Sequence, residues 1–237
     1  DAAYPLNGNY LQTADIDLSA YSNWIPINTF TGTYDGQNYT ISNLTITGNN
    51  KSFQGLFREI SETGRVENLK FINVNINIDG SSSTIGALVG RNRGEVFRVA
   101  VLSGSVRAYN YVGGLAGNVL TPGKAIQCYA NATVQGNSYI DIVSLPDGMG
   151  GTDELQFPNS DIGGLFGEIQ NGGEASNCYS TGNVSGNKDI GGLIGYHTTN
   201  GSVFLKCYAS GAVSSSSGRS GGLVGLNAGT GSDNYWN

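Results

Sequence analysis

The stretch Gly163-Gly164-Leu165-Phe166-Gly167 is one of five copies of a Gly-Gly-Leu-x-Gly motif in this chain. The other copies begin at Gly86, Gly113, Gly191 and Gly221, and the copy at Gly86 has alanine as its second residue. The starts of successive copies are 27, 50, 28 and 30 residues apart. A period of this length is typical of a solenoid, in which each unit buries its apolar residues only between two neighbouring units.

A second landmark follows three of the motif copies: a Cys-Tyr pair with a valine six residues after the cysteine. Aligning Leu69 and Val101 of the earlier coils with these tyrosines favours buried tyrosines, although the pattern leaves open which column points inward. Stacked coils would place equivalent Cα atoms about 4.8 Å apart, a spacing that admits one disulfide. A column of small apolar thiols is the favoured interpretation. The residues are Cys128-Tyr129, Cys178-Tyr179 and Cys207-Tyr208, with Val134, Val184 and Val213.

The composition and the local patterns predict an all-β fold. Glycine is abundant (37 residues), and residues 41–46 and 73–78 alternate apolar and polar side chains as half-buried strands do. The two landmarks and a third short stretch predict three strands per coil. We expect the Gly-Gly pair to form a sharp corner because glycine reaches positive φ without steric cost. The prediction is a right-handed parallel β-helix of about six to seven coils.

The pattern also predicts the domain organisation. Residues 1–30, which are rich in aromatic side chains, are expected to cap the N-terminal end, and residues 31–237 to form the coils. About 22 extra residues interrupt the period, giving an inserted loop at 137–160 on one face of the solenoid. The chain opens at Asp1 and stops partway through a coil, so we expect a fragment of a longer protein with flanking domains.

These motifs resemble the GLUG-motif repeat family, which is named for its Gly-Leu-x-Gly core. Residues 10–18, 30–36 and 41–46 are similar to the segment that commonly precedes such repeats in bacterial surface proteins. The resemblance implies an adhesin-like or stalk module. Such repeats also occur beside polysaccharide-processing modules and in the non-catalytic part of IgA-specific metallopeptidases. The motif is specific for the family and not for a function.

Charge and hydropathy restrict the partners. With 18 acidic and 12 basic residues, the chain lacks the excess of positive charge expected of a nucleic-acid-binding protein or of one that docks on anionic lipid. No apolar run approaches the roughly 18 residues of a membrane span. We therefore expect a secreted or cell-surface protein that binds neither nucleic acid nor the membrane interior.

Acidic residues are the first candidates for chemistry. Asp15 and Asp17 stand at strand spacing, so their carboxylates share one face. A structural or calcium-binding role is favoured for this pair, since calcium prefers oxygen ligands. Asp147, Asp153 and Glu154 of the insertion are the catalytic candidates of the alternative hypothesis, a polysaccharide hydrolase or lyase.

Histidine is represented by His197 alone, which excludes a His-Glu-x-x-His zinc site. We expect this residue to lie in a solvated loop.

Aromatic side chains are the candidates for ligand binding, because sugars pack on flat rings beside polar groups. Tyr109 and Tyr111 precede a Gly-Gly corner, Tyr139 and Phe157 lie in the insertion, and Tyr196 follows a motif copy. The sequence therefore predicts a non-catalytic extracellular module that binds a glycan or a host surface protein. No resident cofactor is expected apart from calcium.

Overall fold

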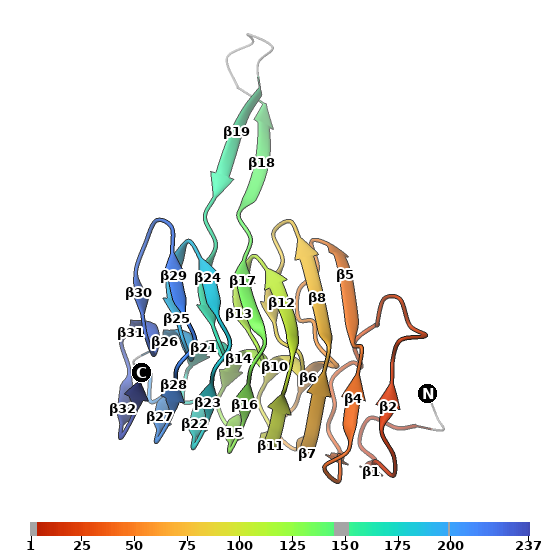
Figure 1. Cartoon of the computed structure of the whole chain (residues 1–237). Helices are drawn as coiled ribbons and strands as arrows, with labels where there is room; N and C mark the ends of the chain where they lie inside the picture. The colour runs from red at the N-terminus through yellow and green to blue at the C-terminus, as the bar shows by residue number, and fades with distance from the viewer. Residues whose placement is uncertain (1–3, 145–151, 199) are drawn as a thin grey trace.

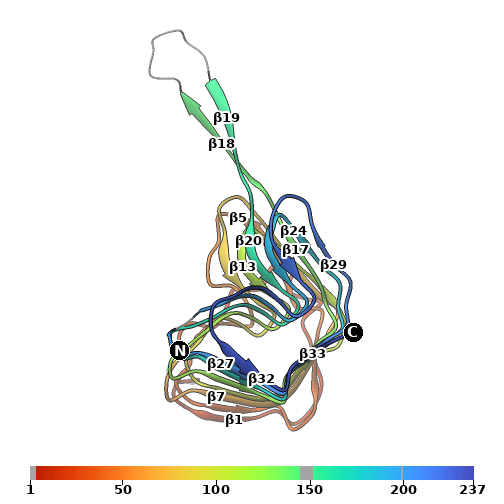
Figure 2. The ribbon, with the colours of Figure 1, turned by 90° about the vertical axis from the view of Figure 1, so that its left-hand side faces the viewer.

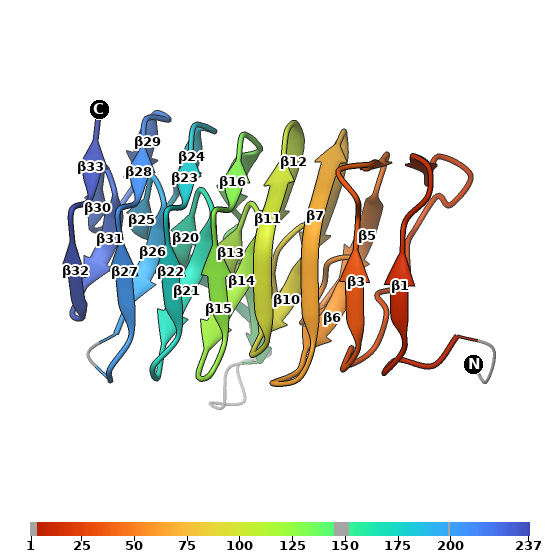
Figure 3. The same ribbon diagram turned by 90° about the horizontal axis from the view of Figure 1, so that it is seen from below.

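A computed structural model describes residues 4–144, 152–198 and 200–237 of the chain. All regular structure within these ranges is β-strand. Strands of successive coils pair in parallel, and the coils stack into about six turns (Figures 1 and 3). The parallel β-helix predicted from the repeat is confirmed.

Four parallel sheets run along the stack, and we name them sheets A to D. Sheet A contains β1 (Asn9–Leu11), β2 (Ile16–Asp17), β3 (Thr33–Asp35), β4 (Thr40–Ser42), β7 (Arg65–Ile72), β11 (Glu95–Val101), β15 (Lys124–Ile126), β16 (Tyr129–Ala130), β22 (Glu174–Ser176), β23 (Tyr179–Ser180), β27 (Val203–Leu205), β28 (Tyr208–Ala209), β32 (Thr230–Ser232) and β33 (Tyr235–Trp236). Sheet B contains β6 (Phe57–Ile60), β10 (Val89–Asn92), β14 (Ala116–Leu120), β21 (Phe166–Gln170), β26 (Ile194–His197) and β31 (Val224–Asn227). Sheet C contains β5 (Thr45–Asn49), β8 (Val74–Asp79), β12 (Gly104–Ala108), β17 (Thr133–Gly136), β24 (Val184–Gly186) and β29 (Val213–Ser215). Sheet D contains β9 (Ser83–Ile85), β13 (Asn110–Gly113), β20 (Ser160–Gly163), β25 (Lys188–Gly191) and β30 (Ser220–Gly221).

The expectation of three strands per coil is therefore wrong. The Gly-Gly-Leu turn separates two short strands, so the residues before it form sheet D and those after it form sheet B. In the coil of the motif copy at Gly163, β20 ends at Gly163 and β21 begins at Phe166. Each complete coil consequently visits sheets D, B, A and C in that order.

The motif glycines are required by close packing between coils and not by positive φ. Among the described residues, the glycines with positive φ lie elsewhere, for example Gly172 and Gly201. A Cβ on Gly164 would overlap the carbonyl oxygen of Gly192, and a Cβ on Gly192 would overlap that of Gly222. The reason that we gave for these glycines is thus wrong, because the constraint comes from the neighbouring coil.

Left-handed backbone at non-glycine residues bends sheet A. In six coils the residue just before the cysteine column has a φ between 51° and 56°. Asparagine and aspartate tolerate this conformation better than most residues, and they supply half of the column. The residues are Asn68, Arg98, Gln127, Asn177, Lys206 and Asp233.

The cysteines point into the core and the tyrosines point outward. Strand register pairs Val99 with Leu69, and Ala100 with Tyr129, so Leu69 belongs to the cysteine column. Our alignment was one residue out of register, and a slip of one residue exchanges the two faces of a strand. The prediction of buried tyrosines is therefore wrong, and Tyr179 is 44% exposed.

The three thiols are buried and free. Each donates to the carbonyl oxygen two residues before it, as Cys178 Sγ does to Ser176 O at 3.3 Å. Cys128 and Cys207 make the same contact with Ile126 and Leu205, at 3.4 and 3.3 Å. The favoured column of packed thiols matches this arrangement.

His197 is buried and lies at the end of β26, so the expectation of a solvated loop is wrong. It continues an inward column of sheet B, in which it pairs with Ile169 on one side and Asn227 on the other. Its Nδ1 lies 2.8 Å from Asn227 Oδ1, and its ring packs edge-on against Phe204 at 4.9 Å. Burial lowers the pKa of His197, an effect that the hydrogen bond to Asn227 opposes.

Two segments depart from the regular coils, one at the N-terminal end of the stack and one in its middle. The segment predicted as a cap supplies β1 and β2, which pair with β3 and β4 at the end of sheet A. The insertion forms an antiparallel hairpin of β18 (Tyr139–Ser144) and β19 (Thr152–Phe157), which we call the arm. The arm projects from the edge of the stacked coils (Figures 1 and 2).

Candidate functional site

Two columns of polar side chains flank the Gly-Gly-Leu turns where sheets D and B meet. One column stands two residues before the first motif glycine, and the other directly follows the last motif glycine. We call this region the polar corner. It comprises Tyr111, Asn118, Asp161, Glu168, Asp189, Tyr196 and Arg219.

Strand register and the motif glycines bring the two columns together. Asn118, Glu168 and Tyr196 are direct neighbours in sheet B. A Cβ on Gly167 would overlap the backbone of Tyr111, so the segment that carries Glu168 packs directly on the preceding coil. Asp161 adopts a left-handed conformation (φ 63°), as Tyr111 does. The side chains of the polar corner are thus placed by the repeat itself.

Two carboxyl groups of the polar corner are buried and form no ion pair with the basic residues of the described ranges. Asp161 is 7% exposed and Glu168 is 5% exposed. Burial raises the pKa of Asp161 to about 6, and the nearby Asp189 charge raises it further against the hydrogen bond from Ser160. Burial, together with the Asp161 charge, raises the pKa of Glu168 to about 7. Both groups therefore exchange protons close to neutral pH.

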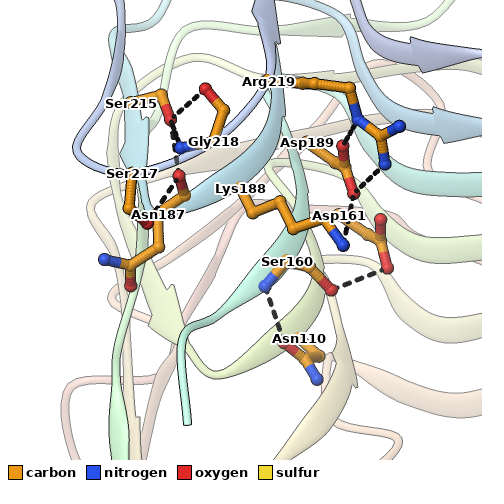
Figure 4. Close-up of polar contacts among 10 residues, drawn as sticks. All are labelled: Asn110, Ser160, Asp161, Asn187, Lys188, Asp189, Ser215, Ser217, Gly218 and Arg219. Atoms are coloured by element: carbon orange, nitrogen blue, oxygen red, sulfur yellow. Dashed lines mark hydrogen bonds and ion pairs between the residues drawn. The ribbon is translucent and has the colours of Figure 1, made fainter. Parts of the chain in front are cut away.

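The neighbouring Asp189 is buried with basic partners (Figure 4). Its Oδ1 accepts from Arg219 Nε at 2.7 Å, and its Oδ2 accepts from Arg219 Nη2 at 3.3 Å. Lys188 Nζ lies 3.9 Å from the same Oδ2. Asp189 is thus an ion-paired carboxylate, whereas Asp161 in the preceding coil is a carboxyl group that burial keeps partly protonated.

An amide and a phenol complete the electrostatic environment. Asn118 is 6% exposed, and its Oδ1 has no hydrogen-bond partner within the described part of the chain. A hydrogen bond from the Asn118 side chain opposes the rise in the pKa of Glu168. Burial raises the pKa of Tyr111, and the charges of Asp161 and Glu168 raise it further. A protonated carboxylic acid beside a second carboxyl group is the arrangement that general acid catalysis uses.

Sequence reasoning missed Asp161, Glu168 and Asp189. The sequence did carry a signal. Two residues before the first motif glycine, Tyr111 of one coil is replaced by Asp161 in the next. Five residues after that glycine, Asn118 is replaced by Glu168. That change is meaningful only once the two positions are known to face each other.

The predicted aromatic residues fall in two places. Tyr111 and Tyr196 lie half-buried in the polar corner. Tyr109 is half-buried just before β13, where its backbone N–H donates to Ser82 Oγ at 3.3 Å. Tyr139 and Phe157 are strand partners at the base of the arm.

The predicted acids are dispersed. Asp147 lies outside the described residues. Asp153 and Glu154 are on β19, opposite Val143 and Ile142 of β18, so the backbone does not bring them near the polar corner.

Asp15 and Asp17 are exposed at the end of sheet A, where each bonds to neighbouring chain. Asp15 Oδ1 accepts from Thr40 N at 2.8 Å. Asp17 Oδ1 accepts from Asn43 Nδ2 at 2.7 Å and from Ser19 N at 2.9 Å. These hydrogen bonds lower the pKa of both carboxyl groups. No group of three or more His, Cys, Asp or Glu residues within 4–144, 152–198 and 200–237 is arranged to hold a metal ion.

The same described ranges contain no helix that is long and apolar enough to cross a membrane.

The proteins that are similar to this chain in sequence are much longer than the chain itself. No protein-family model matches it, so the resemblance to GLUG repeats stays a prediction. Halomucin of Haloquadratum walsbyi is 33% identical over 145 residues, which is 56% of this chain and 2% of halomucin. A protein of Evansella cellulosilytica named "Putative Gly-rich membrane protein" is 36% identical over 96 residues, which is 37% of this chain and 11% of that protein.

The fold is similar to that of one solved structure, a "putative immunoglobulin A1 protease" from Bacteroides ovatus. The TM-score is 0.63 at 19% sequence identity, and the match covers 90% of this chain and 66% of that chain. At this identity the likeness establishes the fold alone. The chain is therefore a β-solenoid module that spans only a small part of the length of its sequence relatives.

Proposed function

We propose that this chain is a non-catalytic repeat module of an extracellular protein, an adhesin-like or stalk segment that binds a glycan or a host surface protein. The fold and the relatives are compatible with such a module, since one relative is named halomucin and another a membrane protein. A stack of coils gives a rigid rod, because each coil is bonded to its neighbours along up to four sheets.

The observation that carries the proposal is the arm. A single antiparallel hairpin, β18 and β19, projects from an otherwise regular stack, whose other coils pass from sheet C to sheet D through short turns (Figure 1). Insertions in solenoids commonly mark the binding face. A projecting hairpin gives the rod one surface that differs from the rest of the stack and can contact a partner.

The test is a glycan-array binding assay on the whole chain, with and without calcium, beside a reducing-sugar release assay on the same polysaccharides. Binding without release supports the proposal. Release of sugar overturns the non-catalytic assignment. If neither binding nor release is detected, a glycan is excluded as the partner and a host surface protein remains. That partner is tested by capture of the chain on immobilised host surface proteins.

A carbohydrate-active enzyme is the second candidate, and the polar corner is the observation that favours it. Asp161 and Glu168 hold protons near neutral pH, as a general acid must. If sugar is released, Glu168→Gln should abolish release, whereas Asp153→Asn together with Glu154→Gln on the arm should leave it unchanged. The reverse result would return the catalytic role to the insertion.

A further inference from the structure

A cavity of about 340 Å³ lies at the foot of the arm, on the outer face of sheet C. Three successive coils contribute to its lining, and all of its lining side chains are neutral. The polar lining groups that matter here are Gln135, Ser138, Ser185, Asn187, Ser214 and Ser216. Their strands also carry the inward Val134 and Val184, which are buried in the core.

The floor of the cavity is a row of hydrogen-bonding side chains that solvent reaches, since Gln135 and Ser214 are exposed and Ser185 is half-buried. Gln135, Ser185 and Ser214 are direct neighbours in sheet C. Within the described part of the chain, none of these three side chains makes a hydrogen bond to the protein. Because adjacent parallel strands lie about 4.8 Å apart, the row presents three donor–acceptor groups at regular spacing.

The wall of the cavity is held in place by Asn187. Its Oδ1 accepts from Ser138 Oγ at 2.9 Å, and its Nδ2 donates to Ser216 Oγ at 2.6 Å. Its backbone N–H donates to Asn159 Oδ1 at 2.8 Å, which ties the outgoing strand of the arm to the next coil. Ser215 Oγ also donates to Asn187 O at 2.5 Å (Figure 4). A wall ordered in advance lowers the entropic cost of binding.

These features specify the class of ligand. Hydroxyl and amide groups both donate and accept, which matches the hydroxyl groups of a sugar. The volume is within the usual range of small-molecule sites. No basic side chain is among the lining residues to neutralise a phosphate or an acidic sugar. We propose that this cavity binds one sugar unit of a neutral glycan; the inference rests on the proposed function and names the place where it is carried out.

The test is an NMR titration of the isotope-labelled whole chain with three neutral probes. They are methyl α-D-mannopyranoside, methyl β-D-galactopyranoside and methyl α-D-glucopyranoside, and inorganic phosphate serves as the charged comparison. At least one neutral probe should shift the amide signals of residues 135–138, 185–187 and 214–216, and phosphate should leave them unchanged. Ser185→Phe should fill the cavity and weaken binding at least ~tenfold, about 1.4 kcal/mol.

Ser176→Phe is the matched control, because Ser176 is a half-buried serine on the outer face of sheet A, away from the arm. This variant should bind as the native chain does. Glycan-array binding without shifts at these three segments overturns the site and leaves the proposed function standing. Absence of both array binding and shifts overturns the site and the glycan as partner, and leaves only the host protein of the proposed function. Equal loss in the two variants also overturns the site.

Discussion

Replacing Glu168 by glutamine should stabilise the protein at neutral and alkaline pH and leave it nearly unchanged in acid. The buried carboxyl group has its pKa raised from 4.5 to about 7. In the window between these two values the folded state binds the proton and the unfolded state does not, so stability falls as pH rises. The contribution of Glu168 is complete below about pH 4.5 and is lost by about pH 7.

The magnitude follows from the size of the shift. A difference of about 2.5 pH units corresponds to about 3 kcal/mol at 1.36 kcal/mol per unit. Glutamine carries no ionisation cost, so Glu168→Gln should gain up to about 3 kcal/mol over the native chain at pH 8. For a chain of this length that gain is roughly 6–12 °C in Tm. Asp161→Asn should act in the same direction, and the double variant should gain less than the sum because the two charges repel each other.

The assay is urea unfolding followed by circular dichroism from pH 4.5 to 8. As pH rises, the free energy of unfolding of the native chain should fall relative to that of Glu168→Gln. Glu174→Gln is the control, since Glu174 is half-exposed on sheet A and its only ion pair is with Lys124 at 3.0 Å among the described residues. Parallel profiles for the native chain and Glu168→Gln would refute the reasoning, as would an equal gain in the control.

Three further predictions concern the core. Gly192→Ala should lower the free energy of unfolding by about 3 kcal/mol or more, because its Cβ would overlap Gly222 O. Gly201→Ala, whose Cβ would meet no atom but whose backbone keeps a φ of 73°, should lower it by only about 1 kcal/mol. Urea unfolding measures both values, and equal costs would contradict close packing between coils. Iodoacetamide should leave Cys128, Cys178 and Cys207 unmodified in the native state and label all three in urea, as read by mass spectrometry; native labelling would contradict their burial. Because the pKa of His197 is lowered in the fold, its own contribution to stability should decline as pH falls below about 6.5. His197→Asn, which matches Asn227 in the same column, should therefore gain stability relative to the native chain as pH falls in urea unfolding. A constant difference between the two chains across pH would exclude His197 as a source of pH dependence.

The repeat predicted the architecture because its landmarks recur at fixed intervals. The five Gly-Gly-Leu-x-Gly copies set the period, and the extra residues at 137–160 located the arm. The reason for each motif glycine depends on contact between coils and could not be predicted from the repeat. The glycine at 164 is dictated by Gly192 of the next coil, and no local rule expresses that distance.

Two errors share one physical cause. Side chains alternate between faces along a strand, so register must be known to a single residue before a residue can be placed inside or outside. Leu69 was aligned with Tyr129 when it belongs with Cys128, and the tyrosines were consequently expected inside. His197 stands within residues 196–201, a turn-like sequence that favours a loop, yet its register with Ile169 places it in the core.

The candidate site was predictable only in part. Tyr111 and Tyr196 stood out as aromatic residues beside the motif, and both lie in the polar corner. Asp161 and Glu168 did not stand out, because an acid is informative only when its burial and its neighbours are known. The same is true of the cavity at the foot of the arm, whose serines are unremarkable until three coils are stacked.

The arm can be removed cleanly, and its removal tests the account most directly. Strand register aligns Ser160 with Lys188 and Gln135 with Ser185, so Asn137 corresponds to Asn187. Deleting residues 138–159 therefore joins Asn137 to Ser160 as Asn187 is joined to Lys188 in the next coil. On the glycan array, the shortened chain should lose the binding shown by the whole chain while its circular dichroism spectrum and unfolding midpoint stay close to the native values. Full binding by a folded, armless chain would contradict the central claim that the arm and its foot form the binding face.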